Sequence, residues 1–297
     1  MIKHKPGFLV GAVTDIGVKR KNNEDSFIVH QSEPLSAGKT GHHIFIVADG
    51  IGGSAAGEVA SNIAVKGVVN TYLSLKDLNP PEALRAAILD AHEQINAKAL
   101  EFPEYSGMGS TLTALVLADN TAHIGQIGDS RAYLIRNNKI VQLTSDQTVT
   151  ADLLVQGKIT PAEAETHPQR HILSQAMGGG RRAPEPELAS YKMRAEDIII
   201  LCSDGLYNLV NDDEIRKIAS KNFPQDACRQ LVDLANERGG YDNITVMVIK
   251  IQGLPWMRRL HRAMHRLTSR TRVVAGMVGA YLAHIVCRVV NIDTGDI

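Results

Sequence analysis

Four clusters of acidic residues along the chain contain the residue types that bind hard divalent cations. They are Asp15 to Asp25, Asp49 to Gly53, Gly128 to Arg131, and the pair formed by Ser203-Asp204-Gly205 and Asp242-Asn243. Magnesium, calcium and manganese prefer carboxylate and carbonyl oxygens as ligands. Asp49 and Asp204 each follow an apolar segment and precede a glycine, so a strand end would fix the carboxylate and the glycine would let the backbone approach a ligand. Taken singly, each Asp-Gly pair is more typical of a tight turn than of a binding site.

Arg20 lies four residues before Glu24 and has a side chain suited to holding a phosphate group. A guanidinium group can donate two parallel hydrogen bonds to phosphate oxygens. The surrounding Lys-Arg-Lys run is also typical of a solvated surface. Phosphate recognition and a surface charge run are therefore both open interpretations of Arg20 taken alone.

The charges are distributed unevenly along the 297 residues, although the formal net charge is zero. Residues 251–297 carry seven arginines and two aspartates, which leaves a formal charge of −5 on residues 1–250. An acidic body disfavours nucleic acid as a partner and suits a protein that collects cations. The hydrophobic content of 44% and charged content of 22% are ordinary for a globular protein with a sizeable core.

The three cysteines, Cys202, Cys228 and Cys287, are far apart and show no zinc-like spacing. Their odd number favours a reducing, cytoplasmic location. The first 13 residues contain no long apolar run or cleavage signature, so we expect no signal peptide. The adjacent histidines His42 and His43 are more typical of a solvated strand end than of a zinc site.

Short apolar runs rich in β-branched residues predict strands, and longer amphipathic segments between them predict helices. The expected strands are Phe8–Val13, Ser26–Val29, Ile44–Val47, Thr111–Leu117, Ala132–Ile135, Ile198–Leu201 and Asn243–Ile249. The expected helices are Ala55–Leu75, Pro80–Leu100 and a block over Asp212–Arg238. Their segregation predicts an α+β fold with sheets inside and helices outside. Gln147–Tyr191 has several glycines and prolines and is expected to be a loop-rich, functional insertion.

Taken together, the clusters resemble the metal-dependent protein phosphatases of the type 2C class, in their bacterial form. Asp15 to Asp25 matches the pattern Asp-x-Gly-x-x-Arg-x-x-Asn-Glu-Asp in full, and Asp49 to Gly53 matches Asp-Gly-x-Gly-Gly. Further matching segments follow in family order: Gly109 to Leu112, Gly128 to Arg131, His167 to Gly178, Ser203 to Gly205 and Asp242 to Thr245. The match runs from about Phe8 to Ile249 and so covers most of the chain.

The resemblance implies a four-layer αββα sandwich, in which two antiparallel sheets are flanked by helices. It implies a phosphatase catalytic domain over residues 1–252, with a flap region at about 147–191. Residues 253–297 then form a C-terminal extension, which we expect to be basic, apolar and helical.

The resemblance also implies roles for individual residues. Asp49 would bridge two metal ions, with the Gly50 carbonyl as a further ligand. Glu24 and Asp25 would hold one side of the centre, and Asp204 and Asp242 the other. Asp129 with Asp204 would form a third, weaker metal site. Arg20 would hold the substrate phosphate, so that Asp49 and Arg20 are the expected catalytic residues.

The implied activity is hydrolysis of phosphoserine and phosphothreonine in proteins, with phosphoprotein substrates and a cognate serine/threonine kinase as partners. Two ions of Mn²⁺ or Mg²⁺ would lower the pKa of a bridging water and orient it for in-line attack on phosphorus. Two alternatives stay open: a two-metal hydrolase of small phosphates, and a degenerate phosphatase domain that serves as an interaction module. The second alternative is disfavoured because the chain keeps every carboxylate of the pattern.

The chain departs from the family pattern at four positions. Ile51 stands where some members have a histidine that is a candidate general acid, and Gln147 stands where many have a histidine. Gln175 and Met177 replace the more usual arginine and leucine of the flap region. These departures leave the general acid unassigned and concern substrate contacts more than the metal centre.

The tail after Ile251 has no counterpart in the resemblance. Six arginines between Trp256 and Arg272 alternate with apolar residues at helical spacing, which predicts a basic amphipathic helix. The apolar stretch Val273–Ala283 is too short to span a bilayer. The tail is therefore interpreted either as a peripheral membrane or partner contact, or as a helix pair docked on the catalytic body.

Overall fold

The computed structural model describes residues 7–32, 41–52, 56–180 and 182–252. These residues belong to one compact unit that ends at Gln252. The predicted basic helix and apolar stretch of the tail lie outside the described residues. Within the described ranges, no helix combines the length and apolar character that a bilayer crossing requires. Cys202 and Cys228 are both free and buried.

Two five-stranded antiparallel sheets form the centre of the fold. The first has the order β1 (Phe8–Asp15), β13 (Ile244–Ile251), β12 (Ile198–Cys202), β8 (Arg131–Arg136) and β9 (Lys139–Gln142). The second has the order β11 (Glu187–Lys192), β7 (Thr121–Ile127), β6 (Leu112–Ala118), β3 (His43–Ala48) and β2 (Ser26–His30). A small third sheet joins β10 (Met177–Gly178), β5 (Gly109–Ser110) and β4 (Gly50–Ile51).

Two helix pairs cover the sheets, and shorter helices lie near one end. The pairs are α1 (Ala56–Ser74) with α2 (Pro80–Glu101), and α6 (Asp212–Lys221) with α7 (Pro224–Glu237). The shorter helices are η1 (Pro103–Tyr105), α3 (Val149–Val155), α4 (Pro161–Thr166) and α5 (Asp204–Tyr207). The start of α2 is fixed by its cap, where the Asn79 side chain accepts a hydrogen bond from the Glu82 amide.

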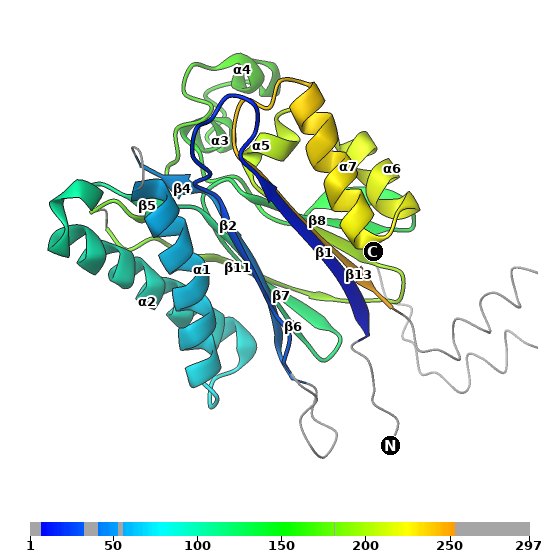
Figure 1. Cartoon of the computed structure of the whole chain (residues 1–297), viewed down its shortest axis with the longest axis horizontal. Helices are drawn as coiled ribbons and strands as arrows, with labels where there is room; N and C mark the ends of the chain where they lie inside the picture. The colour runs from blue at the N-terminus through cyan, green and yellow to red at the C-terminus, as the bar shows by residue number, and fades with distance from the viewer. Residues whose placement is uncertain (1–6, 33–40, 53–55, 181, 253–297) are drawn as a thin grey trace, which may run out of the picture. The chain divides into compact units, whose positions relative to one another are not determined.

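Alternation of side chains along the strands produces three apolar layers. In β3, Ile44 and Ile46 pack against α1 and α2, whereas Phe45 and Val47 point into the space between the two sheets. β12 repeats the pattern. Its side chains at 198, 200 and 202 face α6 and α7, and those at 199 and 201 face the second sheet. Because successive side chains of a strand point to opposite faces, a sheet with apolar residues at every position must be covered on both sides. Figure 1 shows the resulting order of helix pair, sheet, sheet and helix pair.

The predicted α+β class and the αββα sandwich are confirmed, and every strand and helix predicted within the described residues is present. The sequence reading missed the strands β7, β9 and β11, whose polar positions and internal glycine interrupt the apolar runs. β11 also corrects the expected insertion, because residues 187–192 form an edge strand of the second sheet. The flap region is therefore narrower than 147–191, with α3 and α4 projecting at one end of the sandwich (Figure 1).

Candidate metal centre

The strand register brings the predicted acidic residues to one end of the sandwich. In the first sheet, the pairs Cys202 with Val246 and Cys202 with Arg131 place the end of β12 beside the starts of β13 and β8. In the second sheet, the pair Ser26 with Ala48 places the start of β2 beside the end of β3. The carboxylates that follow or precede these strand ends therefore meet: Glu24, Asp25, Asp49, Asp129, Asp204 and Asp242.

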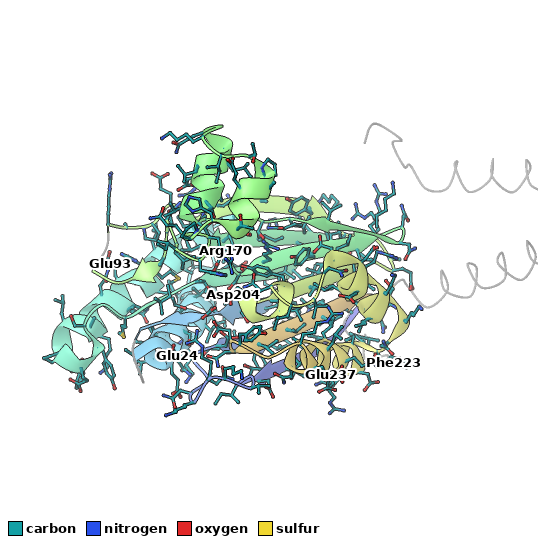
Figure 2. All side chains as sticks on the ribbon, turned by 90° about the horizontal axis from the view of Figure 1, so that it is seen from above. Glu24, Glu93, Arg170, Asp204, Phe223 and Glu237 are labelled. Carbon is teal, nitrogen blue, oxygen red and sulfur yellow. The ribbon has the colours of Figure 1, made fainter. Side chains whose placement is uncertain are left out.

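A cleft of about 1960 Å³ opens at this end of the molecule. One part of its lining contains Arg20, Glu24, Asp49, Gly50, Asp129, Asp204 and Asp242. The flap region contributes further lining residues, among them Arg170, His171 and Leu173. Figure 2 shows Arg170 below the projecting flap helices and near Asp204. The acidic residues and the flap region thus line the same cleft.

Asp49 and Gly50 are held by backbone contacts to neighbouring elements. The Asp49 amide donates to Thr111 Oγ1 at 2.9 Å, and the Thr111 amide donates to the Asp49 carbonyl oxygen at 2.8 Å. The Gly50 amide donates to the Glu24 carbonyl oxygen at 3.1 Å. A Cβ atom on Gly50 would overlap with the Gly57 carbonyl group of α1. Glycine is required here because two backbone segments approach this position too closely for a side chain.

Two buried carboxylate oxygens in the cluster have no hydrogen-bond partner among the described residues. They are Asp25 Oδ1 and Asp204 Oδ1. The other oxygens are partnered: Asp25 Oδ2 accepts from Ser203 Oγ at 2.7 Å, and Asp204 Oδ2 accepts from Asn208 Nδ2 at 3.1 Å. A buried oxygen without a donor is costly, so both positions favour a cationic ligand.

Burial and mutual repulsion raise the pKa of these acids. Burial is the main cause for Asp25, whose pKa rises to about 7. The same cause raises the pKa of Asp129 to about 7 and that of Asp204 to about 6, with repulsion from other acids added in each case. The pKa of Asp49 is raised well above its usual value by burial and then by the charge of Asp25 and other acids. Bound cations would remove this repulsion.

The side chains present therefore fit a hard divalent cation, because all the donors are oxygens and two of them are unpartnered. In the described ranges, no three such side chains already surround a single point closely enough to hold one ion. Arg20 Nη2 lies 2.6 Å from Asp242 Oδ2, so the cluster faces one cationic side chain at this point. The structure brings the predicted acidic residues together at one end of the sandwich.

The residues that position the acids were not predicted from the sequence, although one of them, Asn243, lies inside an acidic motif. Asn243 Oδ1 accepts from the Glu24 amide at 2.8 Å, and its amide nitrogen donates to the carbonyl oxygens of Ile16 and Asn22. Ser61 of α1 donates to the Glu24 carbonyl oxygen at 2.6 Å. The N-terminal motif is thus held by the segment that leads into β13 and by α1, and the sequence signal for Asn243 is its place directly after Asp242.

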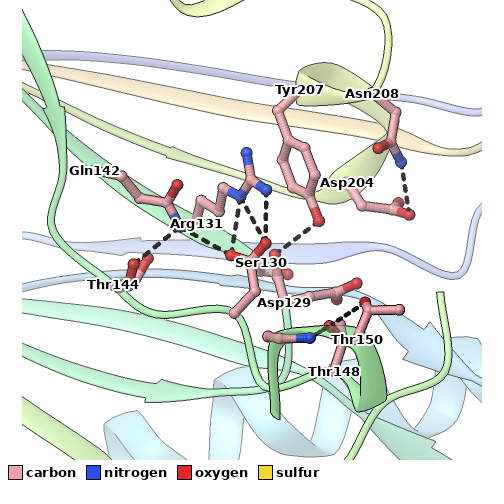
Figure 3. A network of polar contacts seen from close by, with 12 residues as sticks. Asp129, Ser130, Arg131, Gln142, Thr144, Thr148, Thr150, Asp204, Tyr207 and Asn208 are labelled. Carbon is pink, nitrogen blue, oxygen red and sulfur yellow. Dashed lines mark hydrogen bonds and ion pairs between the residues drawn. The ribbon is translucent and has the colours of Figure 1, made fainter. Parts of the chain in front are cut away.

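A polar network surrounds Asp129 (Figure 3). The Tyr207 hydroxyl donates to the Asp129 carbonyl oxygen at 3.0 Å, and the Arg131 guanidinium lies 3.5 Å from the Tyr207 ring centroid. Arg131 also donates to both carboxylate oxygens of Asp146, at 2.9 and 2.6 Å. Gln147, one of the departures, accepts from the Gly128 amide at 2.8 Å. The departure at 147 therefore has a structural role, which is to hold the turn before Asp129.

Ile51 lines the cleft and has no group that can carry a proton. The departure at this position therefore removes one candidate proton donor from the acidic side of the cleft. Gln175, another departure, accepts a hydrogen bond from the Glu185 amide at 2.7 Å. Met177 is fully buried among the residues of α1 and α2.

Comparison with known proteins places the chain in a family. The sequence pattern of the family described as protein phosphatase 2C matches residues 19–239. The protein phosphatase PhpP of Streptococcus pneumoniae is 37% identical over 245 residues, which covers 82% of this chain and 97% of that protein. The crystal structure of the serine/threonine phosphatase PstP of Mycobacterium tuberculosis is similar at a TM-score of 0.71 and 36% identity, over 83% of this chain and 99% of that one.

A second structure, of the PstP catalytic domain in complex with two manganese ions, has a TM-score of 0.69 at 35% identity, with 83% of this chain and 99% of that one covered. The family pattern spans more than half of the chain, and the acidic clusters lie within or next to the matched region. The motifs, the sandwich and the matches agree, and the chain belongs to the protein phosphatase 2C family, whose members use divalent metal ions.

Proposed function

We propose that this protein hydrolyses phosphoserine and phosphothreonine in other proteins, with a water activated by two divalent cations. The convergence of six carboxylates from both sheets beside one arginine is the observation that carries the proposal. The unpartnered oxygens of Asp25 and Asp204 support it, because each lacks the positive partner that a buried carboxylate requires.

The acids would share two ions, Mn²⁺ or Mg²⁺. Asp49 lies at the centre of the charge cluster, since the charges of Asp25, Asp204, Asp129 and Asp242 all act on its pKa. We assign Asp49 and the Gly50 carbonyl to both ions, Glu24 and Asp25 to one side, and Asp204 and Asp242 to the other. Asp129 and Asp204 would provide a third, weaker site. When bound, the ions supply a nucleophilic water at neutral pH and stabilise charge on the phosphoryl oxygens.

Arg20 would bind the substrate phosphate. Its side chain is half exposed at the rim of the cleft, with 48% of its surface accessible, and it is held in place by the ion pair with Asp242. Burial works against its charge, but the hydrogen bond and charge of Asp242 raise its pKa, so Arg20 stays cationic. A guanidinium group held at a fixed position can donate two parallel hydrogen bonds to phosphoryl oxygens, which orients the phosphorus toward the acids.

The catalytic domain is proposed to span residues 1–252, with the flap region forming the opposite wall of the cleft. The substrates are phosphoproteins, and a serine/threonine kinase would supply them. The cytoplasmic location is part of the proposal and rests on the number and spacing of the cysteines. With Ile51 in place of a histidine, the leaving oxygen would take its proton from water or from another group, and no residue is assigned as the general acid.

The test compares three substrates on the purified full chain: a phosphothreonine peptide, a phosphotyrosine peptide and a nucleotide. With manganese present, the phosphothreonine peptide should be hydrolysed fastest, and chelator should abolish turnover. Asp49→Asn should lose several orders of magnitude in kcat while the far-ultraviolet circular dichroism stays that of the wild type. Comparable rates on all three substrates would instead support a broader two-metal hydrolase. Absence of turnover with manganese bound would support an interaction module.

The arginine-rich tail is proposed to contact an anionic membrane surface or a partner, on the sequence evidence of a stretch without acidic residues from Asn243 to Ile292. Cell fractionation with and without residues 254–297 tests this. We expect the full chain to be enriched in the membrane fraction relative to the truncated chain. Equal distribution of the two would remove membrane contact from the proposal.

A further inference from the structure

The last residues of the flap region are attached to the metal centre through the small third sheet. Met177 and Gly178 of β10 pair with Ser110 and Gly109 of β5. β5 pairs in turn with β4, which contains Gly50. β10 is therefore connected through two strand pairs to the backbone beside Asp49. The position of the flap region relative to the acids depends on how firmly β10 is held.

Two polar side chains of α2 hold the loop at β10. The Gly178 amide donates to His92 Nδ1 at 2.9 Å, and the Gly180 amide donates to Asn96 Oδ1 at 3.2 Å. The Asn96 amide nitrogen lies 2.9 Å from His92 Nε2, so the two side chains also contact each other. His92 is 1% exposed, which places an ionisable side chain in the interior of the catalytic body. The ring accepts the Gly178 amide at Nδ1, as the neutral tautomer with its proton on Nε2 can do, so this buried side chain has a polar role as well as an apolar one.

The backbone at this point has a conformation that depends on outside contacts. Gly178, Gly179 and Gly180 have φ values of 73°, 72° and 63°, so three successive residues lie in the left-handed region. A Cβ atom on Gly178 would overlap with the Ile95 side chain of α2. Glycine adopts positive φ values without steric penalty, but it adopts negative φ values just as readily. The hydrogen bonds that the Gly178 and Gly180 amides donate to His92 and Asn96 select one of the available conformations.

We propose that His92 and Asn96 are positioning residues that fix the flap region over the metal centre by accepting the Gly178 and Gly180 amides. The inference rests on the proposed function, because it concerns how the same cleft recognises phosphoproteins. Neither residue contacts the reacting atoms. A phosphopeptide touches both walls of the cleft and so depends on the flap position, whereas a small aryl phosphate fits against the acids and Arg20 alone. Burial lowers the pKa of His92, which agrees with a neutral ring whose Nδ1 accepts a hydrogen bond.

The experiment replaces His92 in the full chain and compares two substrates with manganese bound. His92→Leu removes the acceptor, and His92→Asn keeps an acceptor oxygen near the position of Nδ1. For a phosphothreonine peptide, His92→Leu should raise KM about tenfold, and for p-nitrophenyl phosphate it should change KM by less than about twofold. His92→Asn should recover most of the peptide affinity. Hydrogen exchange of residues 170–180 should be faster in His92→Leu than in the wild type.

Ile88→Val is the matched control, because Ile88 is buried on the same helix but packs under Gly125 of β7. It should lower the melting temperature without changing the peptide KM. An equal rise in the peptide KM for Ile88→Val, or an unchanged KM for His92→Leu, would overturn the proposal. If His92→Leu does not fold, Asn96→Leu at the partly exposed neighbour gives the same comparison. A wild-type enzyme inactive on phosphopeptides would refute the proposed function, and the hydrogen-exchange comparison would still test the attachment.

Discussion

The two ends of strand β12 present two aspartates with buried carboxylate oxygens in opposite electrostatic situations. Asp197 precedes the strand and has a side chain that is 2% exposed, yet it is fully partnered. Arg136 donates to both of its oxygens, at 2.9 and 2.8 Å, and the Arg194 amide donates at 2.6 Å. Asp204 follows the strand, and its Oδ1 has no partner among the described residues. One acid is neutralised by the protein itself, and the other is not.

The difference separates an acid that stabilises the fold from an acid that requires a ligand. Burying a charge is tolerated when a fixed opposite charge and hydrogen bonds accompany it, as at Asp197. At Asp204 the pKa rises to about 6, because burial and then the charge of Asp242 oppose ionisation more than the charge of Arg20 favours it. The protein therefore leaves one end of the strand with excess negative charge that divalent cations would balance.

The largest expected effect comes from neutralising the unpaired acid. Asp204→Asn should lower kcat on a phosphothreonine peptide about 10³-fold, equivalent to ~4 kcal/mol of transition-state stabilisation, because a ligand of the metal centre is lost. In chelator, its melting temperature should equal or exceed that of the wild type, since a buried charge has been removed. Steady-state kinetics and thermal unfolding measure the two quantities.

A stable but fully active Asp204→Asn variant would show that this acid does not serve the metal centre. Loss of activity together with a large loss of stability in chelator would instead show that Asp204 supports the fold, as Asp197 does. Asp213→Asn is the matched control, because Asp213 is an exposed acid of α6. It should change neither kcat nor the melting temperature measurably.

The partnered acid should show the reverse behaviour. Asp197→Asn removes the charge that faces Arg136, a side chain that is 24% exposed, and should lower the free energy of unfolding by about 1–3 kcal/mol. The kcat value should stay within about twofold of the wild type, because Asp197 lies at the opposite end of β12 from the acidic cluster. Urea unfolding and peptide kinetics provide the comparison. A tenfold fall in kcat at unchanged stability would contradict it.

The sequence predicted the acidic end of β12 better than the partnered end. Asp204 precedes a glycine in a motif whose spacing is recognisable, so its role could be expected from the chain alone. Asp197 pairs with Arg136, 61 residues away, and nothing local in the sequence indicates that partner. Contacts between distant segments depend on strand register, which a single sequence specifies weakly when strands such as β7 and β11 contain many polar residues.

The same limit applies to the residues around the site. The ligand candidates could be predicted because each lies at a strand end marked by glycine or asparagine. The hydrogen bond that His92 accepts from the Gly178 amide could not be predicted, because a histidine in an amphipathic helix does not indicate which distant residue it contacts. Its partner Gly178 is 86 residues further along the chain. The αββα order was implied by the family resemblance, whereas the apolar periodicity alone gave only the α+β class.

The pH dependence of stability should also differ between the two ends. The folded pKa values of Asp25 and Asp129 are about 7, above their usual value of 3.8. A group with a raised folded pKa contributes stability that is present below its usual pKa and is lost as the pH rises through the folded pKa. In chelator, the melting temperature should therefore fall as the pH rises from about 5 to about 8.

Saturating manganese should flatten this pH dependence, because the ions bind the deprotonated carboxylates. Asp204→Asn should reduce the slope measured in chelator, since one member of the repelling cluster is gone. Asp197→Asn should keep the wild-type slope, because Arg136 stays charged throughout this pH range. A melting temperature in chelator that is constant or rises with pH would contradict the account of the acidic cluster.

The smallest effect on stability is expected at Arg20, whose pair with Asp242 is the exposed counterpart of the pair between Arg136 and Asp197. The two side chains are 48% and 33% exposed, so solvent screens their attraction and Arg20→Ala should cost less than about 0.5 kcal/mol of unfolding free energy. The KM for a phosphothreonine peptide should rise about tenfold with kcat changed by less than about threefold, because a phosphate contact is lost while the acids are intact. Inhibition by inorganic phosphate should weaken in parallel.

Arg229→Ala, at another exposed ion pair, should leave both constants unchanged. A fall in kcat at constant KM would instead assign Arg20 to the arrangement of Asp242 and remove it from phosphate binding.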